Sequence, residues 1–271
     1  MTFIVLGVLG LCMGSFVNAL VWRLHHQETS KRKSGKFSIA HGRSMCPHCQ
    51  HELAVKDLIP VLSWLWLGGK CRYCRRPIGW QYPLVELSTL GLYLTSYVYW
   101  PYGFDVFGIA LLVTWLTLLI GLVALLVYDL RWMILPNRLV YPLYSLALAQ
   151  IVVLIVQAGS LKPLVGAAGG ILVTSGVFYG LFQISKGQWI GGGDVKLAVI
   201  LGVFAGGFIE GVILIFMASL LGTIVSLPLF IMGKGRGKQI PFGPFLIIAT
   251  IIVYLFGASI IAEYKQRFLL I

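Results

Sequence analysis

Two acidic residues lie at the ends of long apolar segments, and they are the first candidates for chemistry. Asp129 closes one segment in Val127-Tyr128-Asp129-Leu130, and Asp194 opens another in Gly191-Gly192-Gly193-Asp194-Val195-Lys196. An ionisable side chain at membrane depth is costly and usually marks a functional site, and glycines allow another backbone to approach closely. We expect the two carboxylates to meet. Such a pair shares one proton, so that one group acts as a base towards water while the other protonates the leaving nitrogen of an amide.

Other roles remain open for the same two acids. Carboxylates within a membrane also serve proton-coupled transporters, which is the main alternative to proteolysis. Each acid could also be neutralised by a nearby base, since Arg131 and Lys196 are close in sequence to Asp129 and Asp194.

A second group of candidate residues is formed by cysteines in two C-x-x-C pairs. Four thiolates at such spacing can close a tetrahedral zinc site, and four protein ligands leave no open position, so we expect a structural site. Disulfides or a redox role are the alternatives, and His48 or His51 could replace one ligand. Cys12 lies in the first apolar segment, where we expect it to be buried in packing. The predicted zinc ligands are Cys46, Cys49, Cys71 and Cys74.

The composition of the sequence predicts the architecture in which these residues lie. Of 271 residues, 58% are hydrophobic and 11% are charged, and the mean hydropathy is +0.89. Soluble domains are about 25% charged, so the sequence predicts an all-α polytopic membrane protein embedded in a lipid bilayer. The net charge of +12 lies mainly beside apolar segments, which fits the positive-inside rule rather than nucleic-acid binding.

Windows of about 20 apolar residues predict eight transmembrane helices. They cover about 2–22, 84–100, 104–128, 139–157, 165–185, 195–209, 211–232 and 245–262. If the loop after the first helix is cytoplasmic, only Lys162, Lys265 and Arg267 of the 21 Lys and Arg residues fall outside. Both termini then face outward, and Asp129 and Asp194 lie at the cytoplasmic ends of their helices.

Three parts follow from this pattern: a first transmembrane helix over 1–22, a cytoplasmic insert over 23–83, and a seven-helix core over 84–271. Within the insert, residues 27–38 are predicted to be a flexible linker. In the core, a basic glycine-rich loop covers residues 233–240. Asn137 is expected to cap the fourth membrane helix. We expect the substrate cleft to include Gly191, Gly193, Lys196 and Glu86.

Several motifs in order make the sequence resemble a known family. The segments that carry the resemblance are Gly14-Ser15-Phe16-Val17-Asn18, the paired cysteines with Leu58-Ile59-Pro60, Tyr82-Pro83-Leu84-Val85-Glu86, Asp129 before Leu135-Pro136-Asn137, Gly191-Gly192-Gly193-Asp194-Val195-Lys196-Leu197, and Pro241-Phe242-Gly243-Pro244. Together they resemble the type IV prepilin peptidases, GxGD-type aspartic proteases of bacterial inner membranes, along nearly the whole chain. Asn137 differs from the second acid that many members carry there.

The resemblance implies that Asp129 and Asp194 form the catalytic dyad. It also implies cleavage of type IV prepilins or type II secretion pseudopilins after a glycine, at the cytoplasmic face of the inner membrane. The family commonly N-methylates the new N-terminus with S-adenosylmethionine, whose site the sequence does not indicate. A third alternative, in which the insert is a binding module and the helices only an anchor, gives no reason for intramembrane acids. The sequence leaves the choice of pilin and the oligomeric state open.

Overall fold

The computed structural model of the protein describes residues 1–29, 42–232 and 240–268. Most of the predicted linker over 27–38 and of the basic loop over 233–240 lies outside these ranges. The chain divides into two compact units, Met1–Val98 and Tyr99–Ile271.

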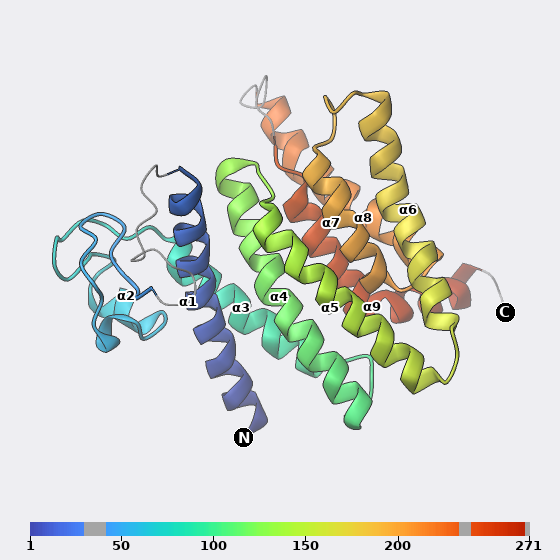
Figure 1. Cartoon of the computed structure of the whole chain (residues 1–271), viewed down its shortest axis with the longest axis horizontal. Coiled ribbons are helices and arrows are strands. Elements are labelled where there is room, and N and C mark those ends of the chain that lie inside the picture. Colours follow the sequence, from blue (N-terminus) through green and yellow to red (C-terminus); the bar gives the residue numbers. More distant parts are fainter. Residues whose placement is uncertain (30–41, 233–239, 269–271) are drawn as a thin grey trace. The chain divides into compact units, whose positions relative to one another are not determined.

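The first unit consists of two long helices and the insert between them (Figure 1). Its elements are α1 (Thr2–Thr29), η2 (Val55–Asp57), α2 (Leu62–Trp66) and α3 (Gln81–Val98). Helix α1 continues past the predicted end at residue 22. Glycines at helical spacing bring α1 against α3: a Cβ on Gly10 would lie 2.9 Å from Leu90 Cα, and one on Gly14 would lie 2.6 Å from Glu86 Cα. Such small residues allow two backbones to pack closely.

Within its described residues, the second unit is a bundle of six helices. They are α4 (Val106–Trp132), α5 (Asn137–Ala158), α6 (Lys162–Ile184), α7 (Gly192–Ala205), α8 (Phe208–Ile231) and α9 (Gly243–Phe268). The α4–α5 and α6–α7 connections lie at the same end of this unit (Figure 1). The core includes Trp115 of α4 and Tyr254 of α9, whose rings stack 4.1 Å apart.

Helices α6 and α7 pack closely because small residues face each other. A Cβ on Gly202 would lie 2.8 Å from the backbone of both Gly170 and Ile171. The Thr174 hydroxyl donates to the carbonyl oxygen of Ala198 at 2.8 Å, so a side-chain hydrogen bond also joins the two helices. This packing fixes the position of α7, whose first turn carries Asp194.

The helical fold is confirmed, whereas the predicted number of membrane spans is not. Among the described residues, six helices are long and apolar enough to cross a membrane: α1, α4, α5, α6, α8 and α9. The other two predicted spans form α3 and α7, and α7 has 14 residues, a length of about 21 Å against a hydrocarbon core of about 30 Å. The prediction of a buried Cys12 is wrong, because its side chain is exposed on α1. A helix in a bilayer can direct apolar residues outward.

Candidate active site and metal centre

Both predicted acids lie beside the first residue of α9. Asp129 is in the last turn of α4 and Asp194 in the first turn of α7. A Cβ on Gly243 would lie 2.5 Å from Asp129 Oδ2 and 3.7 Å from Asp194 Oδ1. The structure therefore brings the two carboxylates within 4 Å of one point, although they are far apart in sequence.

Backbone groups orient the two carboxylates. The Gly243 N–H donates to the Asp129 carboxylate, and the Gly191 N–H donates to that of Asp194. Asp129 is buried and Asp194 is half-buried. A Cβ on Gly193 would lie 3.1 Å from Leu135 Cβ, so the residue before Asp194 packs tightly against the segment that follows α4. Three segments of the second unit thus converge on the acid pair.

The neighbouring bases are directed to other partners. Lys196 Nζ donates to Asn137 Oδ1 at 3.1 Å and lies 6.0 Å from the centre of the Tyr141 ring. The Arg131 guanidinium lies over the ring of Trp132.

Neither Asp129 nor Asp194 belongs to an ion pair with a described base; the ion pairs of the chain include Arg43–Glu52, Arg72–Asp57 and Arg267–Glu263. This geometry disfavours the alternative in which Asp129 and Asp194 are paired with Arg131 and Lys196. The predicted capping role of Asn137 is wrong, because Pro136 is the N-cap of α5 and the Asn137 amide binds Lys196 instead.

The four paired cysteines form a compact cluster. Their Sγ atoms all lie within 4.8 Å of one another, and Cys46 Sγ is 3.8 Å from Cys74 Sγ. A tetrahedral zinc site with Zn–S bonds of about 2.3 Å has sulfur atoms about 3.8 Å apart. The donor set and its spacing therefore fit zinc.

Both cysteine pairs adopt the same local structure. The Cys46 N–H donates to the His51 carbonyl and the Gln50 N–H to the Cys46 carbonyl. In the second pair, the Cys71 N–H donates to the Arg76 carbonyl and the Arg75 N–H donates to the Cys71 carbonyl. Gln50 and Arg75 occupy the corresponding positive-φ positions, at 56° and 59°. Antiparallel bridges close both loops, at Met45–Glu52 and Lys70–Pro77.

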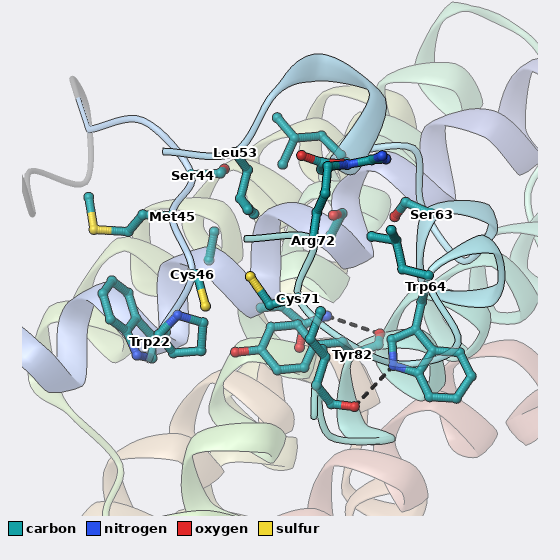
Figure 2. A pocket seen from close by; sticks show the side chains of 18 of the residues that line it. Trp22, Ser44, Met45, Cys46, Leu53, Ser63, Trp64, Cys71, Arg72 and Tyr82 are labelled. Carbon is teal, nitrogen blue, oxygen red and sulfur yellow. Dashed lines mark hydrogen bonds and ion pairs between the residues drawn. The ribbon is translucent and has the colours of Figure 1, made fainter. Parts of the chain in front are cut away.

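Glu86 lies in the first unit, whereas the acid pair lies in the second. Its Oε2 accepts a hydrogen bond of 2.7 Å from the Val61 N–H, which fixes the start of α2 against α3. Glu86 also lines a cavity between α1, the insert and α3. Figure 2 shows this cavity with other residues of its lining, among them Trp22, Trp64 and Tyr82. The place of Glu86 in a substrate cleft remains a prediction.

Gly243 is the residue at the acid pair that sequence reasoning did not assign. The motif Pro241-Phe242-Gly243-Pro244 served only to support the resemblance. A glycine between two prolines in this motif was the available signal, but it does not reveal that α9 begins beside α4 and α7.

Apolar helices of membrane-spanning length, together with a buried Asp129 beside a half-buried Asp194, define a multi-pass membrane protein with a carboxylate pair. Comparison with known proteins is more specific. Residues 8–100 match the model of the bacterial peptidase A24 N-terminal domain, and residues 116–227 match that of the type IV leader peptidase family.

Curated relatives resemble the chain over most of its length. Proteins named "Prepilin leader peptidase/N-methyltransferase" are 37% identical in Stutzerimonas stutzeri, 36% in Pseudomonas aeruginosa and 33% in Aeromonas hydrophila. Each alignment covers 96% of this chain and 92% of the relative. No solved structure shows significant similarity. The chain belongs to the type IV leader peptidase family.

Proposed function

We propose that this protein is a prepilin leader peptidase that also N-methylates the product. The observation that carries the proposal is the convergence of the Asp129 and Asp194 carboxylates at Gly243 in a chain of this family. Its substrates would be type IV prepilins or type II secretion pseudopilins, cleaved after a glycine beside the basic leader. Relatives named for both activities support the assignment.

Asp129 and Asp194 are the proposed catalytic residues. With one proton between them, the ionised carboxylate takes a proton from water while the water attacks the scissile carbonyl carbon. The protonated carboxyl group donates to the amide nitrogen as the carbon–nitrogen bond breaks. The N–H groups of Gly243 and Gly191 keep the two carboxylates oriented. An extended substrate backbone is proposed to pass beside Gly191, where a Cβ would come within 3.7 Å of Asp194 Oδ2, whereas Gly193 packs against Leu135.

Cys46, Cys49, Cys71 and Cys74 are the proposed ligands of one structural zinc ion. The insert is short, and elements η2 and α2 have no fully buried residue, so packing alone supplies little stability. Ligand bonds to a metal would provide the missing folding free energy.

The active site is proposed to face the cytoplasm in the bacterial inner membrane, with the insert on the same side. This orientation rests on the distribution of Lys and Arg. It is consistent with a basic leader that remains in the cytoplasm while the apolar part of the substrate lies in the bilayer. The division into 1–22, 23–83 and 84–271 remains part of the proposal.

S-adenosylmethionine is the proposed methyl donor. It supplies an electrophilic methyl group to the neutral amine, which gives S-adenosylhomocysteine, a methylated amine and one proton.

Cleavage in detergent micelles tests the proposal. Purified wild type, Asp129→Asn and Asp194→Asn are incubated with a type IV prepilin, and the products are identified by mass spectrometry. We expect cleavage after the leader glycine with wild type only, and the mass of one methyl group to be added with S-adenosylmethionine. Substantial cleavage by either folded variant contradicts the dyad. No product from folded wild type with several pilins, together with transport in proteoliposomes, would favour the transporter alternative.

A further inference from the structure

Helix α2 of the insert directs an apolar face outward. Ser63 and Trp64 line the cavity between α1, the insert and α3, so this side of α2 is turned towards the interior of the first unit. The opposite side carries Leu62, Leu65 and Trp66, which are 47%, 58% and 73% exposed. A helix on the surface of a soluble domain directs polar residues outward. The outer face of α2, formed by Leu62, Leu65 and Trp66, has the opposite polarity.

The packing of α3 on α1 shows where the insert lies relative to the membrane. Gly14 of α1 lies against Glu86 of α3, and Asn18 accepts a hydrogen bond of 3.3 Å from the Gln81 side chain. The two helices are therefore antiparallel, and α3 begins at the level of Asn18. About 24 Å of helix separate Thr2, the first residue of α1, from Asn18. The start of α3 thus lies near one surface of a hydrocarbon core of about 30 Å when the start of α1 lies near the other.

Helix α2 and Trp80 lie at this same level. The cavity beside α2 is lined by Asn18 and Trp22, which belong to the last turns of the span predicted for α1. Trp80 directly precedes α3, and its ring lies 4.3 Å from that of Trp64 in α2, yet the residue is 69% exposed. Tryptophan is enriched where lipid headgroups meet hydrocarbon, because its ring is apolar and its N–H is polar. Two exposed tryptophans, Trp66 and Trp80, are therefore present at the depth of this boundary.

The charge of the insert is complementary to an anionic surface. Between residues 42 and 80, six Lys and Arg residues accompany two acids, Glu52 and Asp57. Both acids are already in ion pairs with arginines. Basic side chains beside a membrane attract anionic lipid headgroups. The four unpaired bases are exposed, and none of them forms an ion pair with a described acid: Lys56, Lys70, Arg75 and Arg76.

We propose that the insert binds the membrane surface, with the outer face of α2 and Trp80 at the boundary between headgroups and hydrocarbon. The four unpaired bases bind the headgroups of anionic lipids. Lipid is favoured over a protein partner because this face lies at the depth of the bilayer, where lipid surrounds exposed side chains. The contact follows from the membrane helices and the surface of the insert, and it requires neither of the proposed activities.

Membrane contact also supplies burial that the insert lacks. Neither η2 nor α2 has a buried residue, so packing within the insert holds these elements weakly. Apolar side chains that enter the membrane surface leave water, and the binding strength of such a helix increases with the apolar area that it buries there. The lipid would thus cover the part of the insert that lies outside the two cysteine loops.

Photo-crosslinking of the full-length chain in lipid nanodiscs tests this contact. The photoreactive residue p-benzoylphenylalanine replaces Trp66 in one variant, and two controls carry it in place of Val5 of α1 or Glu52 of the first cysteine loop, which are also exposed. The discs contain equal amounts of phosphatidylcholine and phosphatidylglycerol, and the adducts are identified by intact-mass spectrometry. We expect a yield of lipid adducts at position 66 similar to that at position 5 and about tenfold above that at position 52. Thermal unfolding shows whether each variant is folded.

Two results would overturn the membrane contact. One is a yield of lipid adducts at position 66 no higher than at position 52, when position 5 reacts with lipid. The other comes from crosslinking in native membranes, where an adduct at position 66 with the mass of another protein, or of a second copy of this chain, would assign the outer face of α2 to that partner.

The same adducts test the role of charge. The ratio of phosphatidylglycerol to phosphatidylcholine adducts at position 66 should be about twofold or more above the ratio at position 5. Replacement of the four unpaired bases together by glutamine should lower it to the ratio at position 5. Arg43→Gln combined with Glu52→Gln, which removes an exposed ion pair and leaves the net charge unchanged, should not alter it. Equal ratios at positions 66 and 5 in the otherwise unchanged chain would overturn the binding of anionic lipid.

Discussion

Replacement of Gly243 by alanine should disturb the geometry of the acid pair without lowering the stability of the fold. A Cβ at this position would lie 2.5 Å from Asp129 Oδ2. Ordinary van der Waals contact begins at about 3.4 Å, so the carboxylate must move by about 0.9 Å. The shift is inexpensive for folding because the obstructing atom is the end of a side chain, and alanine favours a helix more than glycine does.

The same shift should be costly for catalysis. A misplacement of about 1 Å in a catalytic group can reduce the rate about 100-fold, equivalent to about 2.7 kcal/mol of transition-state stabilisation. We therefore expect Gly243→Ala to lower kcat for prepilin cleavage about 100-fold, with a much smaller change in KM. The Tm should remain close to that of wild type.

Steady-state cleavage of a purified prepilin in micelles measures both parameters. Gly180→Ala is the matched control, because a Cβ on this α6 glycine would meet nothing within 4 Å. The reasoning is refuted if Gly243→Ala cleaves within threefold of wild type. An equal loss of folded protein would also refute it, because the clash of the Cβ with Asp129 should displace the carboxylate and leave the fold intact.

Three further predictions concern the metal, an ion pair and a helix contact. Wild type should contain about one zinc per chain by elemental analysis and Cys71→Ser much less, whereas equal zinc in the two proteins would exclude the site. The lowered pKa of Asp57 contributes stability above its unfolded-state pKa of about 3.9, and this is lost as the pH falls through the folded-state value. The Tm of Asp57→Asn should therefore be below that of wild type at pH 7, with the gap closing towards pH 3; a gap independent of pH would contradict the argument. Gly202→Ala should lower the Tm more than Gly180→Ala, because its Cβ would meet the backbone of Gly170 and Ile171.

Motifs that are local in the sequence identified the four clustered cysteines and the two neighbouring aspartates. The two C-x-x-C pairs determine their own loops through short hydrogen bonds, so their spacing was sufficient to predict the cluster. The ends of the apolar segments also indicated that Asp129 and Asp194 share one side of the membrane. Their meeting at Gly243 depends on how three helices pack, which is a long-range property. The cavity was likewise not predictable, because its lining comes from α1, the insert and α3.

The errors have physical causes. Exposed and buried apolar residues look alike in a membrane helix, since both faces favour apolar side chains, and Cys12 illustrates this ambiguity. The prediction that Asn137 caps a helix considered only the apolar segment that follows it in the sequence. Its amide instead binds Lys196, a residue of another helix.

The position of Lys196 shows how a base can lie near the acid pair without neutralising it. Residues two apart on a helix do not share a face, so Asp194 and Lys196 of α7 point in different directions. Asn137 and the Tyr141 ring of α5 hold the ammonium group on its own side. An ammonium beside the carboxylates would favour the doubly ionised pair, which lacks the proton that the leaving nitrogen requires. If Asp129 and Asp194 are the catalytic pair proposed above, the contacts of α5 with Lys196 would help to preserve the proton that the two carboxylates have to share.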